Sequence, residues 1–170
     1  MPQEEIITLR LLHIVFGAFW VGTAVFVAAS LEPALRAAAP GVRGPILSRL
    51  SRGIGHMLVA SAVITLAAGV VLALRLRQDS LDAWFDTGWG VAMLIGFIVS
   101  VIALGTSLIT GSTAGAIARI DEQSEDAADG SPDATGSRAE ELGARFRAAV
   151  RWTAVLTVVG VGTMAAARFV

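Results

Sequence analysis

The stretch RLLHIVFGAFWVGTAVFVAASLEP, residues 10–33, decides the fold class of this chain. Between its two terminal charges, the only ionisable side chain is that of His13. As an α-helix, residues 11–31 extend about 30 Å, which is the thickness of a bilayer's hydrocarbon core. In lipid the backbone must satisfy its own hydrogen bonds, and a helix does so. The run is too long and its start too acidic for a cleaved signal peptide. We therefore expect a retained transmembrane helix.

Three further stretches have the same character, at about 54–74, 88–110 and 150–170. The chain is 55% hydrophobic and 16% charged, with a mean hydropathy of +0.70, whereas soluble domains carry about 25% charge. Short links make neighbouring helices antiparallel. The sequence therefore predicts one domain over 1–170, an all-α integral membrane bundle of four helices in up-down-up-down order.

Two helix boundaries and one loop can be predicted from local signals. Pro33 allows a kink before the first helix ends near residue 39. The acidic segment at about 121–138 lacks aromatic residues, which favours a solvated loop that is either a linker or a docking segment. Ser137 and Glu140 have the spacing of a capping box, which would open the fourth helix.

The arginines predict an orientation. Four lie at the end that carries both termini, and nine lie at the other end, among them Arg36, Arg49 and Arg147. Since cytoplasmic loops are enriched in basic residues, we expect both termini on the outer side and the acidic loop in the cytoplasm. The expected location is a bacterial inner (plasma) membrane, with the lipid bilayer as the main partner.

Several function classes are excluded by composition. The chain has no cysteine, which removes disulfides, iron–sulfur clusters and thiolate metal sites. It has no basic stripe of the kind that binds nucleic acid, and its net charge is −1. Signatures of hydrolases, kinases and zinc enzymes are absent, and the spans contain no pair of carboxylates for acid–base chemistry.

His13 is the first candidate for a functional residue. An ionisable side chain inside a span is a functional candidate by default. Arg10, Gly17 and Trp20 share its helix face. A ligand, a glycine that leaves room for a planar ring and an arginine for the propionates together suit a haem. The alternative is a histidine that hydrogen-bonds across the bundle.

The second axial ligand would have to lie at the same depth as His13. Folding the chain at its links places Val71 and Met93 level with it, and Met164 of the fourth helix close to that level, with Arg168 one turn farther out. His–Met ligation is an established haem arrangement. Alternatively, each methionine only fills the core. Copper is a less favoured metal, because the methionines are scattered.

His56 is a weaker candidate for a second site. Arg52 shares its face, and the pair lies about 22 Å from His13 along the axis, so the two histidines cannot bind one iron within a subunit. His56 is either a second haem ligand or an interfacial histidine. Glu32 is predicted to pair with Arg52.

The pattern Leu12-His13-Ile14, then Trp20-x-Gly22 and the exit Glu32-Pro33, resembles the first helix of small bacterial membrane proteins. It is similar to the copper-resistance-D-like membrane domain and to HemJ-type protoporphyrinogen oxidases, over roughly residues 9–35. The resemblance implies a four-helix bundle with His13 as haem ligand. HemJ-type enzymes also depend on a lysine in a later helix, and this chain has no lysine.

These observations predict a cytochrome b-like, haem-binding membrane protein that transfers electrons to or from quinone or a redox protein. If it is an enzyme, we expect a haem-dependent membrane oxidoreductase. Two alternatives stay open: a non-enzymatic membrane subunit or small-ligand-binding bundle without cofactor, and a HemJ-like oxidase, against which the missing lysine argues. A homo-oligomer would bring two copies of His13 together.

Overall fold

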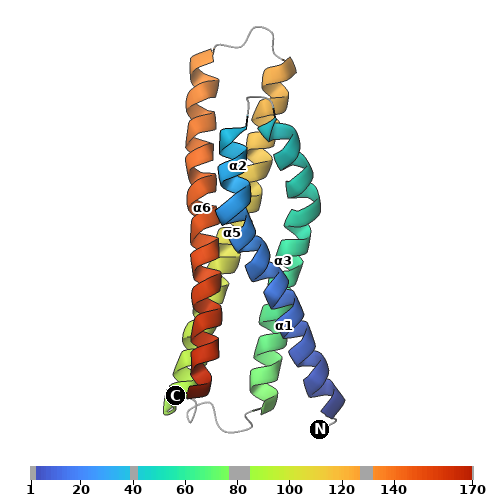
Figure 1. Ribbon diagram of the computed structural model, residues 1–170, viewed down its shortest axis with the longest axis vertical. Helices are drawn as coiled ribbons and strands as arrows, with labels where there is room; N and C mark the ends of the chain where they lie inside the picture. The colour runs from blue at the N-terminus through green and yellow to red at the C-terminus, as the bar shows by residue number, and fades with distance from the viewer. Residues whose placement is uncertain (1–2, 39–41, 77–84, 127–131, 170) are drawn as a thin grey trace.

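The computed structural model describes residues 3–38, 42–76, 85–126 and 132–169, and within these ranges the chain is helical almost throughout (Figure 1). The elements in chain order are α1 (Gln3–Phe26), the π-helical turn η1 (Val27–Leu31), α2 (Glu32–Ala37), α3 (Arg43–Leu76), α5 (Gly88–Asp126), α6 (Pro132–Ala166) and the 3₁₀ turn η2 (Ala167–Phe169).

Four helical segments are long and apolar enough to cross a membrane: Gln3–Ala37, Gly55–Leu76, Gly88–Ile120 and Ser137–Phe169. This confirms the prediction of an all-α chain with four candidate spans. Each helix is longer than the apolar run predicted for it, although α3 and α6 end close to the predicted last residues. Many large apolar side chains point outward, as expected for helices that contact lipid.

Helices that follow one another in the chain pack against each other. α5 makes its largest contact with α6, and α3 packs against both α1 and α5, whereas α1 and α6 meet over a smaller area. Figure 1 shows that these neighbours run antiparallel and that both chain termini lie at the same end. We call this the terminal end, and we call the end that carries α2 and the start of α3 the arginine end.

The first span passes Pro33 through a π-helical turn. The backbone N–H of Glu32 donates to the carbonyl of Val27, five residues back, and the helix continues to Ala37. Proline has no N–H and crowds the carbonyl four residues before it. A π-type turn widens the helix just before the proline. This turn takes up the disruption for which the sequence had suggested a kink.

The predicted loop at 121–138 is wrong at both of its ends. α5 continues to Asp126 and α6 already begins at Pro132, so Ser137 lies inside a helix and opens none. Residues 127–131 lie outside the described ranges. Proline suits the first position of a helix, because its fixed φ and missing N–H cost nothing there. The polar composition indicated exposure to water, but an exposed segment can still be helical when it extends a long helix.

Two clusters of buried side chains hold the helices together. The arginine-end core contains Leu35, Leu47, Ala114, Phe146 and Val150, which belong to α2, α3, α5 and α6. The second cluster, nearer the middle, consists of Trp20, Ala62 and Ala103. The first uses large side chains, and the second fits one indole against alanines.

Candidate functional site

The His13 imidazole bridges α1 and α3. Its Nδ1 lies 2.8 Å from the backbone carbonyl oxygen of Thr65, and the side chain is half-buried. A carbonyl oxygen can only accept, so a neutral imidazole must carry its proton on Nδ1 and a lone pair on Nε2. Within the described part of the chain, Nε2 makes no hydrogen bond. Metal-ligating histidines commonly have this arrangement, with one ring N–H donated to a carbonyl.

The ring of His13 rests directly on Gly69. A Cβ atom at Gly69 would lie 2.8 Å from Cε1 and 2.9 Å from Nδ1 of the imidazole. Any larger residue would therefore push the ring away. The glycine that matters most for His13 is thus on α3, four residues beyond its hydrogen-bond acceptor, and the sequence analysis did not identify it.

Gly17 does not leave the space that we expected. A Cβ at this position would lie 3.3 Å from the methyl carbon of Thr65, so α1 and α3 are already in close contact there. The expectation that a planar group lies beside Gly17 is therefore wrong in this structure. A small residue on a helix face can serve close helix packing as well as ligand access, and here it serves packing.

Trp20 belongs to the interior of the bundle. It is 3% exposed, and its Nε1–H donates to Oγ of Ser107 over 3.3 Å. The Ser107 hydroxyl in turn donates to the carbonyl of Ala103. A buried indole N–H needs such an acceptor. This contact fixes α1 against α5, so Trp20 positions helices and its N–H already has a partner.

The same contact sets the depth of α5 relative to α1. The two helices run in the same direction. Counting back seven residues on each helix from the Trp20–Ser107 contact leads to His13 on α1 and Ser100 on α5, which therefore lie at about the same level. Met93 then lies about 10 Å closer to the terminal end than His13. The register of the Trp20–Ser107 contact therefore does not support the predicted common level of His13 and Met93.

Met164 is engaged between α5 and α6. Its Cγ would lie 2.9 Å from a Cβ at Gly96, so the thioether side chain lies across that glycine. Gly96 is four residues from Ser100, which places Met164 about 6 Å from the level of His13. Met93 is half-buried on the same helix as Gly96. Both methionines thus lie in the predicted half of the bundle, near the terminal end, but neither is level with the imidazole of His13.

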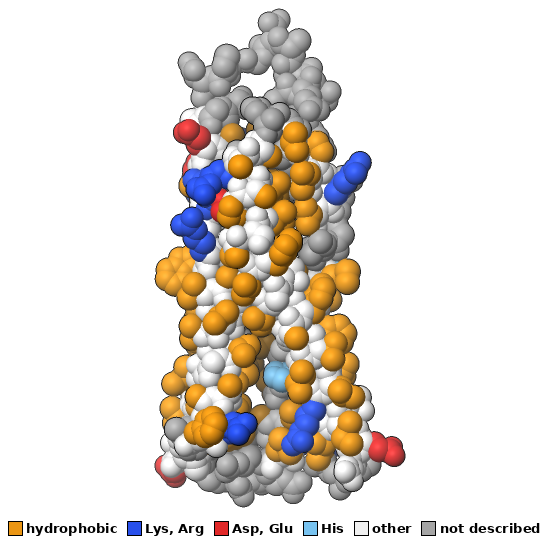
Figure 2. All heavy atoms as spheres, in the orientation of Figure 1, with side chains coloured by type: hydrophobic (Ala, Val, Ile, Leu, Met, Phe, Trp, Pro, Cys, Tyr) orange, Lys and Arg blue, Asp and Glu red, His pale blue; other side chains and the backbone are white. Residues whose placement is uncertain are grey.

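The terminal end carries exposed arginines beside a hollow (Figure 2). Figure 2 shows a hollow in the lower half of the face that it draws. A histidine side chain lies inside the hollow, and one basic side chain lies below it on each side. Arg10 is exposed one turn outward from His13, and Arg168 is exposed with its guanidinium 4.6 Å from the ring centre of Phe169. Arg75 forms an ion pair with Glu5 at 3.3 Å. An anionic group in the hollow would therefore meet positive charge.

His56 is far from this hollow. It is exposed on α3, nine residues before Thr65, and so about 14 Å nearer the arginine end. The side chain of Arg52 lies outside the described residues, so neither its predicted role beside His56 nor its predicted pair with Glu32 can be followed. The two histidines are separate along the bundle, but by less than the predicted distance of about 22 Å.

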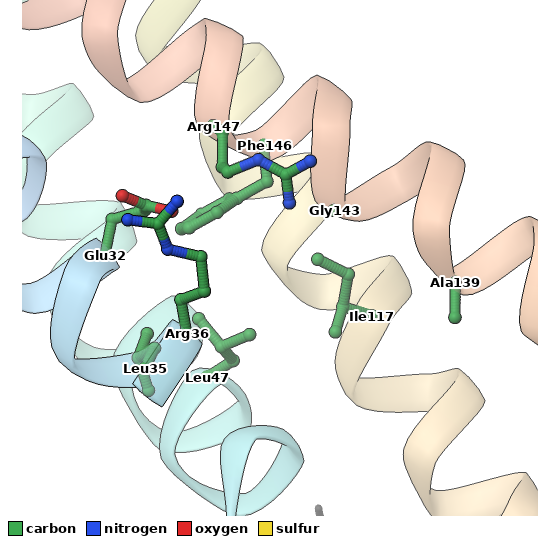
Figure 3. Close-up of a pocket in the computed structure, with 9 residues that line it drawn as sticks. All are labelled: Glu32, Leu35, Arg36, Leu47, Ile117, Ala139, Gly143, Phe146 and Arg147. Atoms are coloured by element: carbon green, nitrogen blue, oxygen red, sulfur yellow. The ribbon is translucent and has the colours of Figure 1, made fainter. Parts of the chain in front are cut away.

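A second candidate site lies at the arginine end, and the sequence analysis missed it. A cavity of about 140 Å³ is lined by residues of four helices: Glu32 and Arg36, Leu47, Ile117, and Gly143 with Arg147 (Figure 3). Glu32 is a carboxylate only 5% exposed. Its position four residues before Arg36 was a signal in the sequence, because such residues share a helix face.

Within the described residues, no group of three or more His, Asp or Glu side chains is arranged to hold a metal ion. A haem is held by axial ligands and not by such a group, and the lone pair of Nε2 of His13 has the chemistry of one such ligand. Comparison with known protein families, with curated proteins and with solved structures finds no match.

Proposed function

We propose that this chain is a b-type haem-binding membrane protein that transfers electrons, with Nε2 of His13 as an axial ligand. One observation carries the proposal. Donation from Nδ1 to the Thr65 carbonyl leaves the lone pair of Nε2 without a described partner, in a half-buried position. An unpartnered polar atom in a membrane span is costly, which favours a functional reason for it.

The residues of the chain would then divide the work of holding the group. The Thr65 carbonyl and Gly69 fix the orientation of the imidazole, while Arg10 and Arg168 offer positive charge to propionates at the terminal end. The apolar helices keep water away from the ligand. When bound, a b-type haem supplies one-electron redox chemistry, with quinone or a redox protein as the partner.

Neither methionine of the chain is level with His13, so a second axial ligand would require a shift of the helices or a second copy of the chain. Met164 is nearer to the level of His13 than Met93 is, but both contribute first to the packing or surface of α5 and α6. We propose Met164 as the second ligand, with His13 of a second copy as the alternative. His56 is the candidate ligand for a second haem.

The proposed setting is a bacterial inner membrane. The terminal end, with Arg10, Arg75 and Arg168, would face outward, and the more basic arginine end would face the cytoplasm. The resemblance of residues 9–35 to the copper-resistance-D-like and HemJ-like group supports both this setting and the role of His13.

The test is an absorption spectrum of the detergent-purified chain, oxidised and reduced with dithionite, with haem counted per chain. We expect a Soret band and sharp reduced α and β bands. His13→Ala should abolish them, and Met164→Leu should change the coordination state. His56→Ala is the matched control: it removes an imidazole outside the hollow and should leave at least one haem. A protein that stays colourless after added haemin contradicts the proposal.

One observation favours a second function, that of a non-enzymatic membrane subunit. The His13–Thr65 hydrogen bond and the fit of the ring on Gly69 already give the histidine a structural role. In that case His13→Ala would weaken the α1–α3 contact by about 1 kcal/mol in a protein that was colourless from the start. Unfolding of the colourless wild type and variant would measure this difference.

A further inference from the structure

We propose that the cavity at the arginine end binds the phosphate group of an anionic phospholipid. Three charged side chains line it, and two of them are arginines. The inference does not depend on haem, because the cavity lies at the opposite end of the bundle from His13.

One carboxylate and two guanidinium groups line the cavity. In Figure 3 the carboxylate of Glu32 and the guanidinium of Arg36 point toward one another, as expected four residues apart on a helix. Arg147 reaches from α6 on the other wall. Within the described residues Arg147 has no carboxylate partner. The lining therefore carries an excess of one positive charge, which matches a phosphodiester monoanion.

Gly143 allows Arg147 to take this position. A Cβ at Gly143 would lie 3.3 Å from a terminal nitrogen of the Arg147 guanidinium. The arginine thus lies along α6 at the edge of the cavity. Planar guanidinium groups bind phosphate oxygens in pairs, so Arg147 at the edge of the cavity suits one phosphate, and Arg36 adds positive charge from α2.

The depth of the cavity is that of lipid headgroups. Glu32 ends the charge-free run of the first span, and Arg36 lies one turn beyond it. On α6, Trp152 is 60% exposed and lies about 7 Å nearer the membrane centre than Arg147. Exposed tryptophans mark the membrane interface. Basic pockets between helices at this level bind anionic headgroups.

The apolar part of the lining favours a lipid over free phosphate. Leu35, Leu47 and Phe146 are buried side chains that border the cavity. Ile117, which also borders the cavity, is half-buried, and the glycerol and first methylenes of a phospholipid would cover its exposed part, which a free phosphate would not. The ligand chemistry is therefore a phosphate with an apolar extension.

The experiment is native mass spectrometry of the full chain in detergent, titrated with dioleoylphosphatidylglycerol. Parallel titrations use dioleoylphosphatidylcholine, whose choline offsets the phosphate charge, and inorganic phosphate. We expect the wild type to bind phosphatidylglycerol most tightly. Arg147→Gln should weaken this binding about tenfold, and the double variant R36Q/R147Q should weaken it further. Arg147→Lys, which keeps the charge but not the fork, should fall between wild type and Arg147→Gln.

The matched control is Arg145→Gln. Arg145 is exposed on the same helix and paired with Glu141 at 2.9 Å, and it does not line the cavity, so its loss removes equal charge and should leave lipid binding unchanged. Equal binding by wild type, R147Q and the double variant overturns the proposal. Binding of inorganic phosphate as tight as that of phosphatidylglycerol overturns the lipid assignment. If the double variant does not fold, R147Q and R147K decide the outcome.

Discussion

The two ends of this bundle are held together in different ways. At the arginine end, large side chains of α2, α3 and α6 meet Ala114 of α5 in one core around Phe146 and Val150. Toward the terminal end, helices approach through glycines and single polar contacts, such as His13 with Thr65 and Met164 over Gly96. Packing by large side chains depends on the volume they fill, whereas a side chain that lies on a glycine depends on the absence of one Cβ atom. Helix packing at the terminal end therefore depends on a few positions, and His13 is one of them.

The largest expected effect comes from removing bulk at the arginine end. Phe146 is 7% exposed in the core, so Phe146→Ala should lower the free energy of unfolding by about 3 kcal/mol through the cavity it leaves. Reversible unfolding in mixed detergent, followed by circular dichroism, measures this. Trp152→Ala, on the same helix but exposed, is the control and should change stability by less than about 1 kcal/mol. Equal losses in both variants would show that this end has no packed core.

A smaller effect, specific to the terminal end, is expected from Gly69→Ala. The added methyl group would meet the imidazole of His13 and should cost about 2 kcal/mol. Gly22→Ala, with nothing within 4 Å of its Cβ position, is the matched control and should be nearly neutral. The double variant with His13→Ala sharpens the test. Removing the ring removes the clash, so the double variant should lose about 1 kcal/mol less stability than the sum of the two single losses. Simple additivity would contradict the contact.

The smallest effect is expected at the surface of the arginine end. Arg145 and Glu141 form an exposed ion pair at 2.9 Å, and such pairs contribute about 0–1 kcal/mol. Glu141→Gln should therefore leave the unfolding midpoint unchanged within error, at low and at high salt. A clear, salt-dependent loss would mean that charge, and not the buried core, determines the stability of this end.

The spans were predictable because each depends on its own residues. Charge-free runs near 11–31 and 88–110 fall inside the helices Gln3–Ala37 and Gly88–Ile120. The loop at 121–138 was not predictable in the same way. Its polar residues indicate water, but water does not by itself prevent a helix from continuing. Composition therefore locates the hydrocarbon core better than it locates the ends of helices.

The candidate site was predictable only in part. His13 stands out in the sequence because an imidazole is rare in a span. The contact of its ring with Gly69 and its hydrogen bond to Thr65 depend on how α1 crosses α3. Counting residues from the link between the helices had instead placed Val71 level with His13. The cavity around Glu32 draws on four helices, so no single segment indicates it.

By itself, the sequence determined that this chain is helical and has four segments able to cross a membrane, because lipid penalises unpaired backbone and charge along each segment separately. It also determined that His13 is the exceptional residue of the first segment. Only the tertiary structure decided which ring nitrogen of His13 faces a carbonyl, that Thr65 fills the space beside Gly17, and that Arg36 and Arg147 meet at one cavity. Those facts depend on tilt, register and side-chain direction between helices, which residue spacing within one helix does not encode.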